Sequence, residues 1–281
     1  MLSGGVSRAA VPILTRALQA VFLPEGMRRR PERPADRAAT DFIAPAASVA
    51  QLTNSPENAR FLQGICDAAR QHQVWVSVGV HEPAEPGADG SREPRCYNTQ
   101  VLVDQAGDVR ERYRKLHLFD VDVKSGPALC ESNTTIPGTR LVPPVQTPVG
   151  KLGMLTCYDM RFPEPSLALR RRGAELLTYP SAFAVRTGAA HWSLLLRARA
   201  AETQCWVLAA AQVGLHAGTT RSSWGHAMVV DPWGSVVAQC SDMPPFAPTF
   251  CLADVDLGTL AQVRADMPLW HQRRQDIYGE L

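Results

Sequence analysis

The stretch KLGMLTCYDMRFP, from Lys151 to Pro163, places a cysteine where a strand ends and a helix begins. Its apolar residues up to Leu155 predict a short strand, and the residues after Cys157 predict a turn into a helix. The start of a helix offers unpaired backbone N–H groups and a positive dipole end, which both stabilise a thiolate and an oxyanion. Position alone leaves two interpretations of Cys157 equally open, a catalytic nucleophile or a small buried apolar side chain.

The chain is long enough, at 281 residues, to bury a core without a disulfide or a metal. Its formal net charge of +2 is too small to indicate binding to a polyanion, so no nucleic-acid partner is expected. Seven cysteines without C-x-x-C spacing indicate neither a disulfide framework nor a zinc site, so a cytoplasmic location with reduced thiols is expected. No stretch is apolar over the length of a membrane-spanning helix, so no membrane partner is expected.

Residues 1–20 contain two arginines, hydroxyl side chains and no acid, a composition typical of a mitochondrial transit segment. We favour the alternative that Pro12 to Ala20 forms the first helix, because the apolar residues continue into Val21 without a cleavage site. The sequence therefore predicts an N-terminal extension or transit segment over 1–20 and one domain over 21–281. Within that domain, residues 26–40 are rich in Arg and Pro and predict an inserted loop.

Hydrophobic patterns predict a mixed α/β fold of about ten strands, with two sheets packed face to face and helices outside. Ser55, followed by Pro56 and Glu57, predicts the start of a helix that runs to His72. Further helices are predicted over Pro165 to Arg172 and His191 to Glu202, and strands over Val74 to Val80, Tyr97 to Asp104, Val109 to Tyr113, Ala174 to Tyr179, Cys205 to Gln212, Gly225 to Val230, Ser235 to Gln239 and Thr249 to Asp256.

Glu25, Lys115 and Cys157 each come just after a predicted strand. A lysine near a thiol stabilises the thiolate and a developing oxyanion, and a carboxylate in the same pocket can move the proton. Taken singly, such a lysine or glutamate is more often a solvated surface residue. Their shared placement predicts acyl transfer.

Three motifs carry a resemblance to a known family: FLPE at Phe22 to Glu25, YRKLHLFD at Tyr113 to Asp120, and CYDMRFPE at Cys157 to Glu164. They resemble the Glu-Lys-Cys motifs of the nitrilase superfamily of carbon–nitrogen hydrolases. The similarity is greatest to the Nit domain of the Nit/Fhit proteins, through CESN at 130–133, LTYPSAF at 177–183, the segments 191–212 and 225–234, and HQRRQDIYG at 271–279.

The resemblance implies a role for each matching residue. Cys157 would be the nucleophile and Glu25 the general base, while Lys115 and the backbone N–H of Tyr158 would hold the oxyanion. Glu131 would support the site by orienting Lys115. The implied fold is a four-layer α-β-β-α sandwich that associates into a homo-oligomer, and the implied reaction needs no metal or organic cofactor.

The implied activity is hydrolysis of a small amide through a cysteine thioester. Nit-type relatives act in metabolite repair on deaminated glutathione, releasing 2-oxoglutarate and cysteinylglycine; an ω-amidase acting on 2-oxoglutaramate-like substrates is the alternative. Tyr179, Ser181 and Arg186 are weaker candidates for contact with a substrate carboxylate.

The N-terminus departs from the family pattern. Members have a strand and a full helix ahead of FLPE, whereas here a short stretch precedes Phe22, so the first strand is predicted to be missing or altered. The Arg/Pro-rich insert would lie at the mouth of the site. Both features flank Glu25, and a third interpretation is therefore a catalytically impaired form that acts as an interaction protein.

Overall fold

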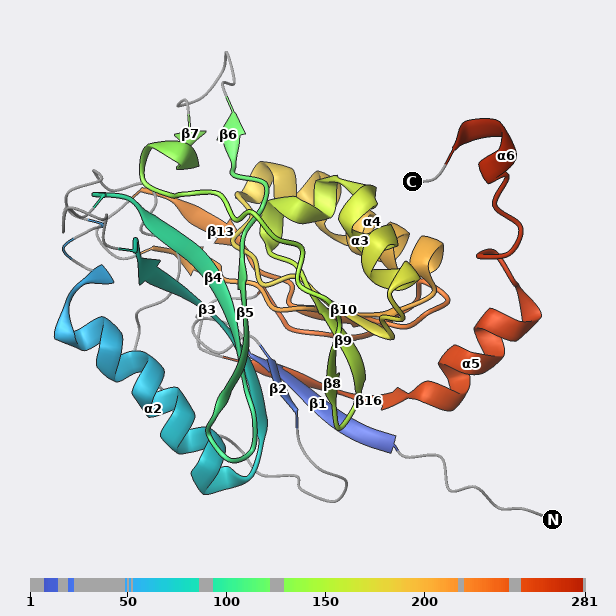
Figure 1. The fold of residues 1–281 in the computed structure, drawn as a ribbon, viewed down its shortest axis with the longest axis horizontal. Coiled ribbons are helices and arrows are strands. Elements are labelled where there is room, and N and C mark those ends of the chain that lie inside the picture. Colours follow the sequence, from blue (N-terminus) through green and yellow to red (C-terminus); the bar gives the residue numbers. More distant parts are fainter. Residues whose placement is uncertain are drawn as a thin grey trace.

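The computed structural model describes residues 8–14, 20–22, 49, 51, 53–85, 93–121, 129–216, 220–242 and 249–279. Two sheets lie between two layers of helices (Figure 1). The first sheet has the order β2 (Ala20–Phe22), β3 (Trp75–Pro83), β4 (Cys96–Val103) and β5 (Val109–Arg114). The second has the order β15 (Val236–Gln239), β14 (Met228–Val230), β11 (Trp206–Ala209), β10 (Leu176–Thr178), β9 (Gly150–Met154) and β8 (Val145–Thr147).

Helix α2 (Pro56–His72) covers the outer face of the first sheet (Figure 1). It begins as predicted, because the Ser55 side chain accepts a hydrogen bond from the Asn58 N–H. Its buried residues Ile65, Cys66 and Ala69 form one apolar cluster with the valines of β3 and β4. Burial of this stripe holds the helix against the sheet.

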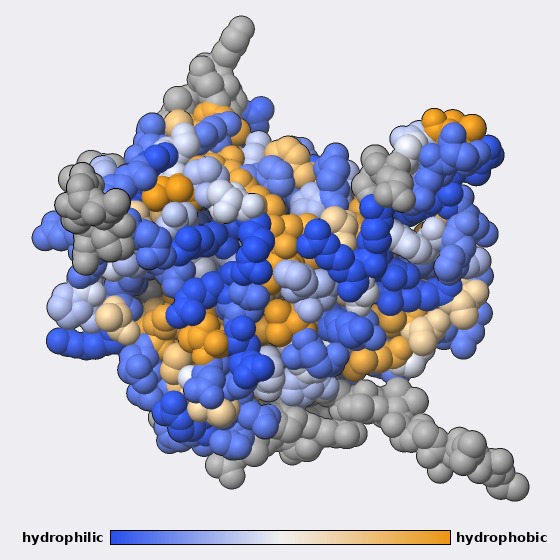
Figure 2. Space-filling model, in the orientation of Figure 1, coloured by the Kyte–Doolittle hydropathy of each residue, from blue (hydrophilic) through white to orange (hydrophobic). Residues whose placement is uncertain are grey.

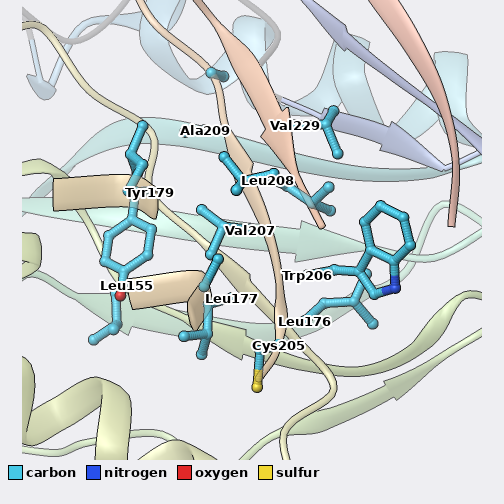
Figure 3. Close-up of a cluster of buried hydrophobic side chains, with 14 of the residues drawn as sticks. Leu155, Leu176, Leu177, Tyr179, Cys205, Trp206, Val207, Leu208, Ala209 and Val229 are labelled. Carbon is cyan, nitrogen blue, oxygen red and sulfur yellow. The ribbon is translucent and has the colours of Figure 1, made fainter. Parts of the chain in front are cut away.

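Helices α3 (Pro163–Arg171) and α4 (Val185–Thr203) cover the outer face of the second sheet, the face that points away from the first sheet (Figure 1). Each connects two neighbouring parallel strands, α3 joining β9 to β10 and α4 joining β10 to β11. Figure 3 shows the packed side chains of the core around this sheet, which include Leu176 and Leu177 of β10 and Val207 and Leu208 of β11. The carboxyl ends of β9 and β10 therefore meet at one edge of the sheet, where a site forms in many α/β folds.

Gln100 of β4 fixes the two sheets relative to each other. Its side-chain amide donates to Ser77 Oγ in β3 and to Thr178 Oγ1 in β10, each at 2.7 Å. All three side chains are buried. A polar link between otherwise apolar faces is stable only in one alignment, so this contact specifies how the sheets stack.

The predicted helix over Pro12 to Ala20 is wrong at 12–14 and at 20, the part of it that the structure describes, and the first strand, predicted to be missing or altered, is present. Strand β1 (Arg8–Leu14) pairs antiparallel with β16 (Phe250–Asp256) along its whole length, from Arg8 opposite Asp256 to Leu14 opposite Phe250. The seven-residue edge of β16 supplies backbone partners that no local pattern reveals. Among the described strands β1 is hydrogen-bonded only to β16, and a proline is compatible with a strand paired on one edge. The insert 26–40 lies outside the described residues.

The remaining elements are short strand pairs, 3₁₀ helices and two C-terminal helices. They are the strand pairs β6 (Asp120–Val121) with β7 (Leu129–Cys130) and β12 (Val213–Leu215) with β13 (Ser222–Trp224), the 3₁₀ helices η2 (Glu131–Asn133) and η3 (Cys157–Arg161), and the C-terminal helices α5 (Leu257–Asp266) and α6 (Gln275–Tyr278). Hydrophilic side chains cover most of the face shown in Figure 2. None of the described helices is long and apolar enough to cross a membrane.

Candidate active site

A cleft with about 660 Å³ of open space lies where β9 and β10 end. Cys157 follows β9 and Ser181 follows β10, while Lys115 directly follows β5 of the other sheet. All three line the cleft. The structure thus brings together Lys115 and Cys157, which are 42 positions apart in the sequence.

Cys157 is held in an unusual backbone conformation. It is the first residue of η3, it is half-buried, and its φ of 48° lies in the left-handed region that residues other than glycine rarely adopt. Two hydrogen bonds flank it, from the Thr156 N–H to Asp159 Oδ2 at 2.8 Å and from the Asp159 N–H to the Thr156 carbonyl at 3.0 Å. A strained residue of this kind persists where its neighbours enforce it, and such residues cluster at functional sites.

Lys115 forms a buried ion pair with Glu131. The side chains are 3% and 0% exposed, and Lys115 Nζ donates to Glu131 Oε2 at 2.5 Å. The same carboxylate accepts from Asn98 Nδ2 at 3.2 Å and from the Phe119 N–H at 2.7 Å. Three donors from two segments, β4 and the connection after β5, therefore hold this carboxylate and fix the direction of the Lys115 ammonium.

The electrostatic setting keeps Lys115 charged. Burial lowers the pKa of Lys115, but the carboxylate of Glu131 and the thiol of Cys157 raise it by more, so the pKa lies above its ordinary value. At neutral pH this side chain is a cation. It can stabilise negative charge in the cleft, but it cannot accept a proton there.

Asp159 is a central residue that the sequence analysis missed. Its carboxylate is fully buried and accepts from Tyr113 Oη at 2.7 Å, from the Thr156 N–H at 2.8 Å and from the His117 N–H at 3.0 Å. The ring Nδ1 of His117 lies 2.8 Å from the same carboxylate. Asp159 therefore ties the turn of Cys157 to the segment that carries Lys115. One signal was available, since T-x-x-D at 156–159 is a helix-capping pattern.

The other predicted site residues are placed as follows. Tyr179 is fully buried, its hydroxyl lies 2.6 Å from Ser166 Oγ, and it is not part of the cleft lining. Arg186 is exposed on α4, also outside that lining. Within the described part of the chain, the arginines that line the cleft are Arg161 and Arg221, which the sequence analysis did not select. Glu25 lies outside the described residues.

No group of three or more His, Cys, Asp or Glu side chains within the described ranges is arranged to hold a metal ion. The polar groups around Cys157 are instead an ammonium, hydroxyls, amides and guanidinium groups. Such donors stabilise negative charge on a reacting carbonyl.

The sequence was compared with known protein families and with solved structures. Residues 21–265 match the model of the carbon–nitrogen hydrolases. The chain belongs to this family. The human protein named deaminated glutathione amidase is 49% identical over 243 residues, which cover 86% of this chain and 72% of that protein.

Two solved structures show that the hydrolase has a nitrilase-superfamily fold. The NitFhit protein of C. elegans matches with a TM-score of 0.72 and 43% identity over 83% of this chain. The match covers 53% of that fusion protein, about half of its length. Nit3 of Saccharomyces cerevisiae, described as a member of branch 10 of the nitrilase superfamily, matches with a TM-score of 0.67 and 25% identity over 98% of this chain and 100% of that one. The predicted four-layer sandwich is confirmed.

Proposed function

We propose that the protein is an amidase that hydrolyses deaminated glutathione to 2-oxoglutarate and cysteinylglycine, a metabolite-repair reaction. The strained Cys157 in the same cleft as the buried Lys115–Glu131 pair supports cysteine-based amide hydrolysis. The name of the human relative supports the substrate. The domain responsible is the stretch 21–281.

The reaction has two covalent steps. The thiolate of Cys157 attacks the amide carbonyl carbon, and the oxyanion that forms is stabilised by Lys115 and the backbone N–H of Tyr158. The C–N bond then breaks, the amine leaves with a proton, and a thioester remains on Cys157. Water attacks the thioester and releases the carboxylate and the free thiol.

The proton must be carried by a group other than Lys115, because the raised pKa of that lysine keeps it protonated. The family resemblance assigns this role to Glu25, whose carboxylate would take the thiol proton, pass it to the leaving amine and then activate the water. Glu131 is already engaged by three donors, so it serves as the residue that positions Lys115.

Release of 2-oxoglutarate from deaminated glutathione by the purified protein tests the proposal. The expected result is turnover by the parent enzyme and none by Cys157→Ala, which removes the nucleophile and little packing. A parallel assay with 2-oxoglutaramate measures the ω-amidase alternative. Turnover of 2-oxoglutaramate with a higher kcat/KM than deaminated glutathione would replace the proposed substrate.

Thiol labelling separates an enzyme from an interaction protein that has lost activity. Burial raises the pKa of Cys66 and Cys205, so these thiols react slowly, while Cys130 is exposed and serves as the reference. In an active enzyme Cys157 is alkylated faster than Cys130 near neutral pH, as followed by peptide mapping. Slower labelling of Cys157 than of Cys130 would favour the interaction protein.

Association into a homo-oligomer, a dimer or higher, is also part of the proposal, as is a cytoplasmic location with a mitochondrial alternative. Analytical ultracentrifugation of the purified chain measures the first. Fractionation of cells that express the tagged chain measures the second.

A further inference from the structure

The described residues place more than one cationic side chain in the cleft. Lys115, Arg161 and Arg221 line it, and no Asp or Glu of the described chain does. The charge of Lys115 is balanced by Glu131 behind it. Among the described residues, Arg161 and Arg221 contribute the two guanidinium groups of the cleft lining.

Arg161 is packed among aromatic rings. Its guanidinium lies 5.6 Å from the ring centre of Tyr158 and 5.5 Å from that of Phe183, and its Nη1 is 3.2 Å from His191 Nδ1. These contacts hold the Arg161 guanidinium between η3 and α4.

Arg221 is fixed in the cleft lining next to the β12–β13 pair. Its Nη2 donates to the Ala182 carbonyl at 3.0 Å, and its own carbonyl accepts from the His216 N–H at 2.9 Å. The Trp224 N–H donates to the Phe183 carbonyl at 2.8 Å, so the strand pair is anchored to the loop that follows β10. The side chain is thus held in place before any substrate binds, which reduces the entropic cost of binding.

Arg221 also lies within electrostatic reach of the reaction centre. Burial lowers the pKa of Arg221, and the thiol of Cys157 and the carboxylate of Glu131 offset part of that effect. A guanidinium remains charged under these conditions. Its planar fork matches a carboxylate in geometry, and the interaction is strong in a partly desolvated cleft.

We propose that Arg221 receives a carboxylate of the substrate and so restricts the cleft to amides that carry one. This inference rests on the proposed amidase function, because both substrates considered there contain a carboxylate on the acyl side. Deaminated glutathione carries a second one, on the glycine of the leaving amine. The acyl-side and amine-side carboxylates are the two sources that the experiment must distinguish.

The first test compares two alkylating reagents of similar size and different charge. Iodoacetate and iodoacetamide both react with the thiolate of Cys157, so the ratio of their rates at that residue cancels any change in thiolate fraction. We expect Arg221→Gln to lower the iodoacetate-to-iodoacetamide ratio by about tenfold. Added salt should lower the ratio in the parent enzyme more than in the variant.

The second test identifies the carboxylate. 2-Oxoglutarate represents the acyl side and alanylglycine the amine side, and each is titrated for protection of Cys157 against iodoacetamide. If Arg221 binds the acyl side, Arg221→Gln raises the protecting concentration of 2-oxoglutarate about tenfold or more; if it binds the amine side, the same rise appears with alanylglycine. Either result supports the proposal and names the source.

Two variants serve as controls. Arg60→Gln removes a guanidinium from α2 that is 77% exposed and outside the cleft, and it should change neither readout. Arg221→Lys retains a cation without the fork, so it should keep most of the rate ratio even if Arg221→Gln unfolds. Unchanged ratio and protection in Arg221→Gln, or no protection of the parent by either carboxylate, would overturn the proposal. Because alkylation requires no turnover, this failure is distinct from failure of the amidase assignment.

Discussion

The hydroxyl of Tyr113 donates a 2.7 Å hydrogen bond to the carboxylate of Asp159, and both side chains are fully buried. Burial raises the pKa of Tyr113, and the neighbouring Asp159 carboxylate raises it further, to well above its ordinary value. The hydroxyl is therefore a permanent donor. This contact joins β5, which precedes Lys115, to the turn that begins with Cys157.

Loss of this bond should reduce both stability and catalysis. Tyr113→Phe leaves the Asp159 carboxylate one donor short, and we expect the free energy of unfolding to fall by about 1.5–3 kcal/mol. We also expect kcat to fall, because the turn of Cys157 loses a fixed point. Urea denaturation and steady-state kinetics measure the two effects.

Tyr179→Phe is the matched control. It removes another buried hydroxyl, bonded to Ser166 and outside the cleft lining, so it should cost stability without lowering kcat. Equal losses of kcat in the two variants would show that Tyr113 has no special connection to the nucleophile. A loss of kcat in Tyr179→Phe but not in Tyr113→Phe would restore the sequence-based assignment of Tyr179 to substrate binding.

The contrast between Lys115 and Asp159 shows what the sequence could predict. Lys115 and Glu131 were found because family motifs mark them, and α2 was found because Ser55 and Pro56 signal a helix start locally. Asp159 was missed because Tyr113 lies 46 positions away, and no local pattern encodes that contact. Strand β1 was missed for the same reason, since its partner β16 lies at the other end of the chain.

Lys115→Met should nearly abolish hydrolysis while Cys157 still reacts with iodoacetamide. A lost oxyanion contact costs about 3–4 kcal/mol of transition-state stabilisation, which corresponds to a fall of about 10²–10³ in kcat. The buried Glu131 also loses its cation, so a fall of about 3–5 kcal/mol in unfolding free energy is expected. Lys151→Met, at an exposed position of β9, should change neither value. Activity of Lys115→Met within a few-fold of the parent would show that the proposed triad is wrong.

The Lys115–Glu131 pair should also give a signature at alkaline pH. The pKa of Lys115 is higher in the folded protein than in the unfolded chain, so its stabilising contribution is fully present below the ordinary lysine pKa of about 10.4 and is lost as pH rises through the folded value. The difference in unfolding free energy between the parent and Lys115→Met should therefore be constant from about pH 7 to 9 and shrink above about pH 10.5. Urea midpoints at each pH measure it. A decline centred near neutral pH would contradict the raised pKa.

Cys157→Gly and Cys157→Ala should both be inactive but differ in stability. The φ of 48° is strained for alanine and free for glycine, so the glycine variant should be more stable than the alanine variant by about 1 kcal/mol. At Ala168 in α3 the order is reversed: Ala168→Gly should lower the free energy of unfolding by about 1 kcal/mol, because glycine is less stable than alanine at an ordinary helical position. Thermal and urea unfolding of the three variants measure the pattern. Greater stability of Cys157→Ala than of Cys157→Gly would show that the position carries no strain.

The pairing of β1 with β16 predicts the effect of shortening the chain. Removal of residues 1–14 takes away the partner of all seven residues of β16 and leaves an unpaired edge beside the exposed Leu252, which is 42% exposed even with β1 in place. We expect a lower melting temperature, faster aggregation and faster hydrogen exchange in peptides that cover Phe250 to Asp256. Removal of residues 1–7 keeps β1 and is the matched control, which should show parent-like exchange in the same peptides. If both truncations leave β16 equally protected, then β16 is stable without β1, and the first strand does not contribute to the fold in the way that its register indicates.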